Sequence, residues 1–281
     1  MKIVCGIKQM QEISGKLRVC GKGIGFVPTM GALHAGHLSL IAQARRDCDF
    51  VVVSIFINPL QFGPQEDFKN YPRVFKQDAA ICRKAGVDCL FYPGFLEMYP
   101  QEYKTYVIVE GLSDKLCGKF RPGHFRGVAT VVAKLFNIVS PSIAYFGQKD
   151  AQQAVIIRKM ATDLNLPVRI KVMPTLREQD GLAMSSRNRY LTPEQRQDAL
   201  SLSLSLKLAR ALVKSGVKDS SKVIIAIRQL LGSKQKVKIE YVSIVNVDTL
   251  EPLKKIFGKC LICLAARVGK TRLIDNILIG S

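Results

Sequence analysis

The sequence predicts an α/β protein: a doubly wound parallel sheet, followed by a small α+β domain. Short apolar runs alternate with amphipathic stretches through about the first 173 residues, which favours βα units with helices on both faces of a sheet. From Pro174 the pattern changes to two amphipathic stretches and then three apolar runs. We therefore expect a Rossmann-like domain over residues 1–174 and a C-terminal α+β domain over residues 175–281.

The first domain opens on a strand-like run at the N-terminus and continues with alternating elements. Strands are expected at 24–28, 50–57, 88–92, 142–146 and 168–173, and helices at 37–47, 73–85, 125–139 and 151–164. Each strand is a short apolar run, and each helix carries apolar residues at helical spacing. Ligands of such sheets bind outside the carboxyl ends of the strands, so we expect the functional residues in the loops that follow them.

The second domain begins with a polar, glycine-containing segment. Thr192 as N-cap and Pro193 at the first helical position predict a helix over 193–214. The leucines of this helix that recur every four residues are expected to pack on the core: Leu200, Leu204, Leu208 and Leu212. A second helix over 221–231 and antiparallel strands at 237–245, 260–267 and 271–279 complete this domain.

Composition predicts a cytoplasmic protein. Hydrophobic residues make up 48% and charged residues 23% of the 281 residues, which is typical of a soluble globular chain. No apolar run approaches the roughly 18 residues of a transmembrane helix, so no membrane partner is expected. The N-terminal apolar run is soon interrupted by Lys8 and Glu12, unlike a signal peptide.

The eight cysteines fall mostly in apolar stretches, which is typical of reduced thiols in a core. Cys260 and Cys263 form a C-x-x-C pair, but apolar neighbours surround it and no second ligand pair is near in sequence. We therefore expect a buried strand there and no metal site.

Basic residues outnumber acidic residues strongly. Lys and Arg number 42 against 22 Asp and Glu, for a net charge of +20. Such an excess is compatible with nucleic acid, an anionic substrate or a solvated basic surface. Because the basic residues are spread along the chain without a dense block, the solvated surface is preferred and no nucleic-acid partner is expected.

The segment from Phe26 to His37 is the most informative motif. His34 and His37 flank Gly36 between a strand and a helix, where free backbone N–H groups and the helix end favour phosphate. Gly31 and Gly36 let the backbone approach a ligand, and the imidazoles can donate hydrogen bonds to charge developing on a phosphoryl group. The alternative, two ordinary surface histidines near a turn, is weakened because the chain has only three histidines.

Other polar segments also follow predicted strands or turns. Gln61 lies in a loop after the second of these strands, and Lys149 lies at a helix N-terminus within Gly147–Asp150, where its charge can meet phosphates. Gln153 follows on the same helix, and Met184–Arg187 offers two hydroxyls and a guanidinium in a polar loop. Each residue alone is explained by a surface amide, a helix start or a cap, but together they favour a nucleotide site.

These motifs resemble the pantothenate synthetase (pantoate–β-alanine ligase) family over essentially the whole chain. That family belongs to the H-x-G-H nucleotidyltransferase superfamily, whose K-M-S-K-S loop is replaced here by Met184–Arg187. The matching segments are 28–37, 56–62, 66–67, 71–73, 121–128, 146–150, 153, 158–160, 185–188 and 272–276.

The resemblance implies an ATP-dependent, AMP-forming carbon–nitrogen ligase of pantothenate and coenzyme A biosynthesis. Pantoate would first form pantoyl adenylate and pyrophosphate, and β-alanine would then displace AMP. The first domain would bind ATP and pantoate and carry out catalysis, and the second would act as a lid. Magnesium would accompany ATP, and the protein would be a homodimer, with the apolar run 50–57 and its following loop near the interface.

The resemblance also implies residue assignments. His37 and His34 would be catalytic with Lys149, and the substrate residues would be Gln61 and Gln153. No protein metal site is implied. The ATP-binding residues would be Met30, Gly31, Ala32, Leu33, His34, Ala35, Gly36, His37, Gly147, Gln148, Lys149, Asp150, Leu176, Met184, Ser185, Ser186 and Arg187.

Two alternatives remain open from the sequence. Another H-x-G-H nucleotidyltransferase would share the histidine loop but would not need the segments around Gln61 and Lys149. A basic RNA-binding or tRNA-charging protein would account for the charge, which the family resemblance does not explain. Against it, no anticodon domain is recognisable, and the basic residues are not interleaved with aromatic residues as in a strand-binding groove.

Overall fold

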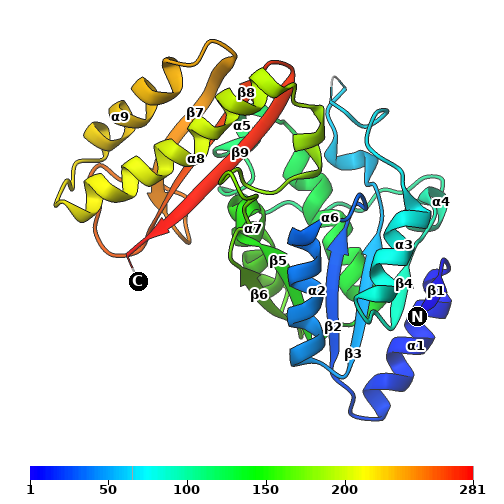
Figure 1. Ribbon diagram of the computed structural model, residues 1–281. Coiled ribbons are helices and arrows are strands. Elements are labelled where there is room, and N and C mark those ends of the chain that lie inside the picture. Colours follow the sequence, from blue (N-terminus) through cyan, green and yellow to red (C-terminus); the bar gives the residue numbers. More distant parts are fainter. Residues whose placement is uncertain (65, 281) are drawn as a thin grey trace. The chain divides into compact units, whose positions relative to one another are not determined.

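The computed structural model describes residues 1–64 and 66–280 (Figure 1). The chain divides into two compact units. The first comprises Met1–Asp114, Arg121–Gly147 and Ile156–Pro174. The second comprises Lys115–Phe120, Gln148–Val155 and the chain from Thr175 onward.

The first unit is built on a six-stranded, wholly parallel sheet in the order β1-β4-β3-β2-β5-β6. Its strands are β1 Lys2–Val4, β2 Ile24–Thr29, β3 Phe50–Ile55, β4 Cys89–Phe91, β5 Ile143–Gly147 and β6 Arg169–Met173. Its helices are α1 Ile7–Val19, α2 Ala35–Asp47, η1 Pro59–Gln61, α3 Phe75–Lys84, α4 Phe95–Met98, α6 His124–Val139 and the second part of α7 Ala151–Asp163. The predicted parallel α/β fold is confirmed.

Helices cover both faces of this sheet. In Figure 1, α2 crosses in front of the sheet and α6 lies behind it. Val27 and Val53 share a buried cluster with Ile41 of α2. The next strand position points the other way, and Phe26 meets Phe136 of α6 edge to face, with ring centroids 6.5 Å apart. Strand alternation therefore feeds two separate apolar layers.

The sheet reverses its winding between β2 and β5. These strands pair only at Gly25 with Ile143 and at Phe26 with Ala144. Pro28 lies beyond the last of these pairs, so its missing amide leaves no gap in that ladder. Ligands of open α/β sheets bind at such a switch point, outside the carboxyl ends of the strands. The histidine loop begins there, after β2.

Two features of this unit differ from expectation. Helix α1 was not predicted, because its stretch is largely polar and buries only Met10 and Ser14. The expectation that 50–57 lies near a subunit interface is wrong for the strand itself. Residues 51–55 are at most 4% exposed and lie within the sheet, so they offer no surface to a second chain.

The second unit has a three-stranded antiparallel sheet in the order β7-β8-β9. Its elements are α5 Cys117–Phe120, η2 Gln148–Asp150, the first part of α7, η3 Ser186–Tyr190, α8 Pro193–Lys214, α9 Ser220–Gly232, β7 Val237–Asn246, β8 Cys260–Val268 and β9 Thr271–Ile279. Helices α8 and α9 share one buried apolar cluster with the sheet. The predicted α+β architecture is confirmed.

Helix α8 begins as predicted but buries a different face. Thr192 accepts from the Gln195 amide at 3.3 Å, and the Gln195 side chain accepts from the Thr192 amide at 3.2 Å. Leu202 and Leu206 are 1% exposed, whereas Leu204 of the predicted stripe is 49% exposed. Leucine at every second position marks no single face of a helix. Packing selected the face that also carries the buried Ala199 and Ala209.

Most of the cysteines are buried, as predicted. Burial raises the pKa of the Cys82 thiol to about 12 and that of the Cys89 thiol to about 11, so both remain protonated. Cys260 and Cys263 lie buried in β8. Cys5 and Cys20 are exceptions, since both are exposed.

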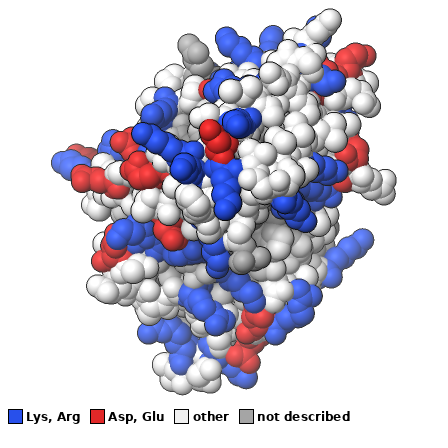
Figure 2. Space-filling model, turned by 90° about the vertical axis from the view of Figure 1, so that its left-hand side faces the viewer, with Lys and Arg blue, Asp and Glu red and all other residues white. Residues whose placement is uncertain are grey.

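Charged side chains cover the face shown in Figure 2, where Lys and Arg are scattered with Asp and Glu between them. The basic residues do not gather into one block on that face, in agreement with a solvated basic surface. Among the described residues, no helix is long and apolar enough to cross a membrane.

Candidate nucleotide and acid site

The histidine loop is held from below by a buried carboxylate. Asp78 of α3 is 2% exposed and accepts hydrogen bonds from the amides of Ala32 at 2.9 Å and Leu33 at 2.8 Å. Gly31 has a φ of +79°, and a Cβ there would lie 2.9 Å from the Asp78 Oδ2 and 3.1 Å from the Ile55 Cγ2. Glycine is therefore required where the loop passes over this carboxylate.

His34 and His37 cap the start of α2 reciprocally. The Nδ1 of His34 accepts from the Gly36 amide at 3.1 Å, and the Nδ1 of His37 lies 3.3 Å from the His34 amide that donates to it. The ring centroids are 4.1 Å apart. A neutral imidazole that accepts at Nδ1 carries its proton on Nε2, so both rings present an Nε2–H donor at a helix N-terminus.

Gln61 follows β3 in the short helix η1 and is 9% exposed. Its Nε2 lies 2.9 Å from the Met30 Sδ, and its Oε1 accepts from the Asn58 Nδ2 at 3.2 Å. The structure thus brings a predicted substrate residue to the first residue of the predicted ATP loop. A thioether is a weak acceptor, so an oxygen of a ligand can replace it at little cost.

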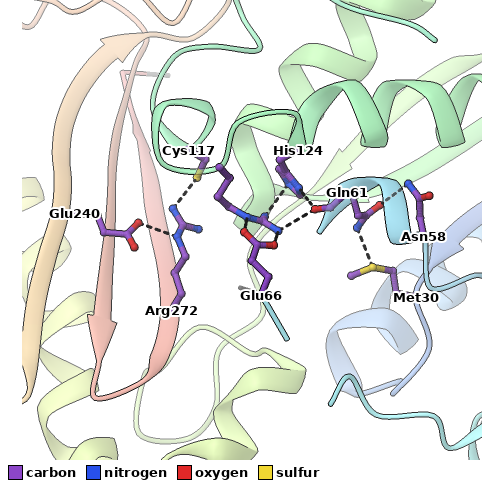
Figure 3. Close-up of polar contacts among 9 residues, drawn as sticks. Met30, Asn58, Gln61, Glu66, Cys117, His124, Glu240 and Arg272 are labelled. Carbon is purple, nitrogen blue, oxygen red and sulfur yellow. Dashed lines mark hydrogen bonds and ion pairs between the residues drawn. The ribbon is translucent and has the colours of Figure 1, made fainter. Parts of the chain in front are cut away.

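The backbone of Gln61 is fixed by two side chains near the start of α6 (Figure 3). Its carbonyl oxygen accepts from the His124 Nδ1 at 2.8 Å and from the Arg121 Nη2 at 3.2 Å. The Nε2 of His124 lies 2.9 Å from the Arg121 Nη1. Because arginine only donates, this Nε2 accepts, and His124 is held as the Nδ1–H tautomer.

Arg121 is anchored in turn by Glu66, whose two carboxylate oxygens accept at 2.6 and 2.5 Å. Burial raises the pKa of Glu66, but the hydrogen bonds and charge of Arg121 outweigh it and hold that pKa below its ordinary value of 4.5. The carboxylate therefore stays ionised near neutral pH and orients the guanidinium toward Gln61.

Helix α6 also touches η1 through bare backbone. A Cβ on Gly127 would lie 2.1 Å from the Leu60 carbonyl oxygen, so only glycine allows this approach. The carbonyl oxygen of Gly127 accepts from the Asn58 Nδ2 at 3.0 Å. Gln61 is thus supported from both its side chain and its backbone by residues of one rigid unit.

In the second unit, Lys149 lies in η2, directly before α7, as predicted for a helix start. Its side chain is 21% exposed, and its Nζ lies 4.0 Å from the Asp150 carboxylate. The backbone carbonyl oxygens of Gln148 and Lys149 both accept from the Asn276 Nδ2, at 3.0 and 2.9 Å. The predicted phosphate-binding segment is therefore tied to β9.

The segment around Leu176 and Met184 forms one turn. The Leu176 carbonyl oxygen accepts from the Met184 amide at 3.0 Å, and Arg177 pairs with Ala183 in an antiparallel bridge. Ser185 then accepts from the Arg187 amide at 3.3 Å and begins η3. The expected polar loop is therefore a capped helical turn. Its hydroxyls and guanidinium follow directly from the Leu176 hairpin.

Two neighbouring glutamines of α7 differ sharply. Gln152 is buried, accepts from the Cys117 amide at 3.0 Å and donates to the Lys115 carbonyl oxygen at 2.7 Å. Gln153 is half-buried, and its side chain makes no hydrogen bond within residues 1–64 and 66–280. The Gln153 amide is therefore available to a ligand, whereas that of Gln152 is structural.

The comparison with protein families now decides the affiliation. A family model described as Pantoate-beta-alanine ligase matches residues 2–278. The chain belongs to the pantoate–β-alanine ligase family. Among its relatives, the pantothenate synthetase of Thermotoga petrophila is 55% identical over 280 residues, covering 100% of both chains. That of Caldicellulosiruptor bescii is 53% identical over 279 residues, covering 99% of both.

Solved structures of the same family agree in fold. A crystal structure of pantoate-beta-alanine ligase (pantothenate synthetase) from Thermus thermophilus has a TM-score of 0.94 at 45% identity, covering 99% of both chains. A pantoate-beta-alanine ligase from Francisella tularensis, complexed with beta-gamma ATP and beta-alanine, has a TM-score of 0.81 at 36% identity, covering 99% of this chain and 97% of that one. The predicted family resemblance is confirmed.

Several supporting residues of this pantoate–β-alanine ligase relative were missed from sequence. Asp78 gave no signal, because it lies on an ordinary amphipathic helix. Glu66, Arg121 and His124 lie in matching segments, but no role could be assigned to them. Asn276 also lies in such a segment, and its side chain ends on two backbone carbonyls that no sequence pattern marks.

Proposed function

We propose that this chain is an ATP-dependent ligase that joins pantoate to β-alanine, through pantoyl adenylate, and releases AMP and pyrophosphate. The observation that carries the proposal is the pair His34 and His37, which present two Nε2–H donors at the N-terminus of α2. Membership of the family over residues 2–278 supports it, as does the ATP and β-alanine complex of the Francisella relative.

In the first half-reaction, a pantoate carboxylate oxygen attacks the α-phosphorus of ATP, and the bond to pyrophosphate breaks. Negative charge grows on the leaving pyrophosphate. The Nε2–H groups of His34 and His37 and the first amides of α2 are proposed to stabilise that charge, with His37 as acid catalyst. Lys149 is proposed to neutralise phosphate oxygens, together with the hydroxyls and guanidinium of Ser185–Arg187.

Pantoate is proposed to bind to Gln61 and Gln153. A carboxylate and hydroxyl groups need both donors and acceptors, and a primary amide supplies both. Support comes from the weak sulfur partner of the Gln61 Nε2 and from the Gln153 amide, which makes no hydrogen bond in the described chain.

In the second half-reaction, the amine of β-alanine attacks the acyl carbon of pantoyl adenylate. The bond to the AMP oxygen breaks, and the amine loses one proton as the amide forms. No covalent enzyme intermediate is needed, so catalysis consists of positioning and charge stabilisation. Gln61 is proposed to serve this step as well, because pantoyl adenylate keeps the acid moiety in its place.

Magnesium is proposed to enter with ATP. The described residues contain no group of three or more His, Cys, Asp or Glu side chains that could hold a metal ion. Magnesium commonly binds through one or two carboxylates and the phosphates of its nucleotide, so such a group is not required. Asp150, whose side chain is 49% exposed beside Lys149, would supply a carboxylate. The ion would screen the charge of the triphosphate.

We further propose a division into domains 1–174 and 175–281, and a cytoplasmic homodimer, following the family resemblance. Half-exposed apolar side chains such as Leu96 at 67% and Ile108 at 59% support a second copy as their cover. Light scattering is expected to give twice the chain mass of 31.2 kDa, and a monomer mass would refute the dimer.

The deciding experiment measures pantothenate and pyrophosphate with ATP, pantoate and β-alanine, omitting each in turn. Pyrophosphate is expected with ATP and pantoate alone, and pantothenate only with all three. The same assay with phospho-sugar or nucleotide acceptors tests another nucleotidyltransferase. RNA-dependent pyrophosphate release would indicate a tRNA-charging protein instead.

A further inference from the structure

Strand β9 carries two adjacent buried polar residues in the middle of the antiparallel sheet. Asp275 is 2% exposed and Asn276 is 4% exposed, and they pair with Leu264 and Cys263 of β8. Successive side chains of a strand point to opposite faces, so the two reach different surroundings. Buried polar groups of this kind need partners, and each finds them on a segment outside the sheet.

Asn276 holds the segment that contains Lys149. Its Nδ2 donates to the carbonyl oxygens of Gln148 at 3.0 Å and Lys149 at 2.9 Å, and its Oδ1 accepts from the Gln148 Nε2 at 3.1 Å. All of these polar atoms of the amide are used. Asparagine is suited to this position because it offers two donors and an acceptor on a short side chain.

Asp275 holds the segment that leads to Ser185–Arg187. Both of its oxygens accept from the Arg177 guanidinium, at 2.7 and 2.9 Å, and its Oδ1 also accepts from the Asn276 amide at 2.7 Å. Arg177 donates further to the Gly181 carbonyl oxygen at 3.1 Å and pairs with Ala183. The bidentate pair therefore fixes the hairpin that precedes Ser185.

We propose that Asp275 and Asn276 are positioning residues that hold both phosphate-binding segments of the second unit in one fixed arrangement. The inference rests on the proposed ATP-binding role of Lys149 and Ser185–Arg187. Groups that neutralise a triphosphate must be placed before the reaction, and a displacement of about 1 Å can cost about 10²-fold in rate. A regular strand paired to β8 is a rigid support for this purpose.

The test uses Asn276→Asp in the full-length protein. The aspartate has the same shape, but its oxygens cannot donate to the two carbonyl groups and instead face them. We expect kcat/KM for ATP in adenylate formation to fall by about 10–100-fold. The KM for pantoate, and the reaction of preformed pantoyl adenylate with β-alanine, should change little.

A matched control separates positioning from loss of stability. Ile262 of β8 is fully buried in the core of the same sheet, and Ile262→Val should lower the melting temperature without changing the kinetics. The second arm is tested by Arg177→Lys, which keeps the charge but not the bidentate contact. It should show the same selective defect toward ATP, and it keeps the proposal testable if Asn276→Asp does not fold.

Calorimetric binding of a non-hydrolysable ATP analogue gives a readout that needs no acid substrate. Weaker binding by Asn276→Asp and Arg177→Lys, with wild-type binding by Ile262→Val, supports the proposal. Wild-type affinity in Asn276→Asp, or a parallel loss toward ATP and pantoate that follows melting temperature, overturns it. If the wild type binds the analogue but makes no pantothenate, the proposed function fails and the positioning result is still read from binding.

Discussion

His124 donates from its Nδ1 to the backbone carbonyl oxygen of Gln61 at 2.8 Å. The ring can do so only as the Nδ1–H tautomer, which Arg121 enforces by donating to its Nε2. The third histidine of the chain thus belongs to the support of the proposed pantoate site, although it lies far from the histidine loop in sequence.

The first prediction concerns this contact. His124→Leu should raise the KM for pantoate by about tenfold, equivalent to one net hydrogen bond of about 1.4 kcal/mol, with a smaller effect on ATP. His124→Asn should be milder, because its amide can still donate near the former Nδ1. Steady-state kinetics with each substrate varied in turn decide. Equal changes toward ATP and pantoate would remove His124 from this role.

The second prediction concerns Lys149. Lys149→Ala should lower turnover on the order of 10²-fold or more, as expected for a lost charge-stabilising donor. The melting temperature should remain close to that of the wild type, since the side chain packs against little. Lys159, 55% exposed on the same helix α7, is the matched control, and Lys159→Ala should be active. Near-normal turnover of Lys149→Ala would exclude it from the site.

The third prediction separates the neighbouring glutamines. Gln153→Ala should raise the KM for pantoate far more than that for ATP, because a hydrogen bond to a charged group contributes about 1.5–3 kcal/mol. Gln152→Ala should chiefly lower the melting temperature, because it leaves the Cys117 amide and the Lys115 carbonyl group without their partner. A pantoate defect in Gln152→Ala and not in Gln153→Ala would reverse the assignment.

The fourth prediction separates chemistry from helix capping in the histidine loop. His34→Ala and His37→Ala should mainly damage adenylate formation and spare the reaction of preformed pantoyl adenylate with β-alanine, because no triphosphate is then present. His34→Asn keeps a favourable N-cap but lacks the Nε2–H, so it should be as defective as His34→Ala yet more stable.

Single-turnover measurement of each half-reaction, beside melting curves, tests this pair. Parallel loss of both half-reactions together with stability would show that the histidines only order the helix.

The fifth prediction concerns acid stability. The pKa of Glu66 in the folded state lies below its ordinary value of 4.5, so its contribution is complete above that pH and is lost as the pH falls through the folded-state pKa. Glu66→Gln should therefore be less stable than the wild type at neutral pH, and the difference should shrink in acid.

Denaturant unfolding across pH 3–7 (an approximate range) measures this difference. Glu251, whose side chain is 62% exposed in its pair with Lys115, is the control, and Glu251→Gln should change stability little. A pH-independent loss in Glu66→Gln would mean that the side chain contributes packing and no charge interaction.

The sequence by itself determined the sheet strands, the main helices after α1 and the phosphate-binding loops. Each of these depends on local patterns: apolar runs, helical spacing, Thr192 and Pro193 at a helix start, and glycines around His34 and His37. Because parallel strands end at a common edge, their following loops could be assigned to a site before any contact was known.

Only the tertiary structure decided which residues support that site. Asp78 is 46 residues from the amide of Ala32, Arg121 is 55 from Glu66, and Asn276 is 127 from Lys149. The buried face of α8 was decided in the same way, by packing among leucines that its sequence spreads around the helix. Such contacts join segments that are distant in the chain, and no local periodicity records which segments the folded core brings together.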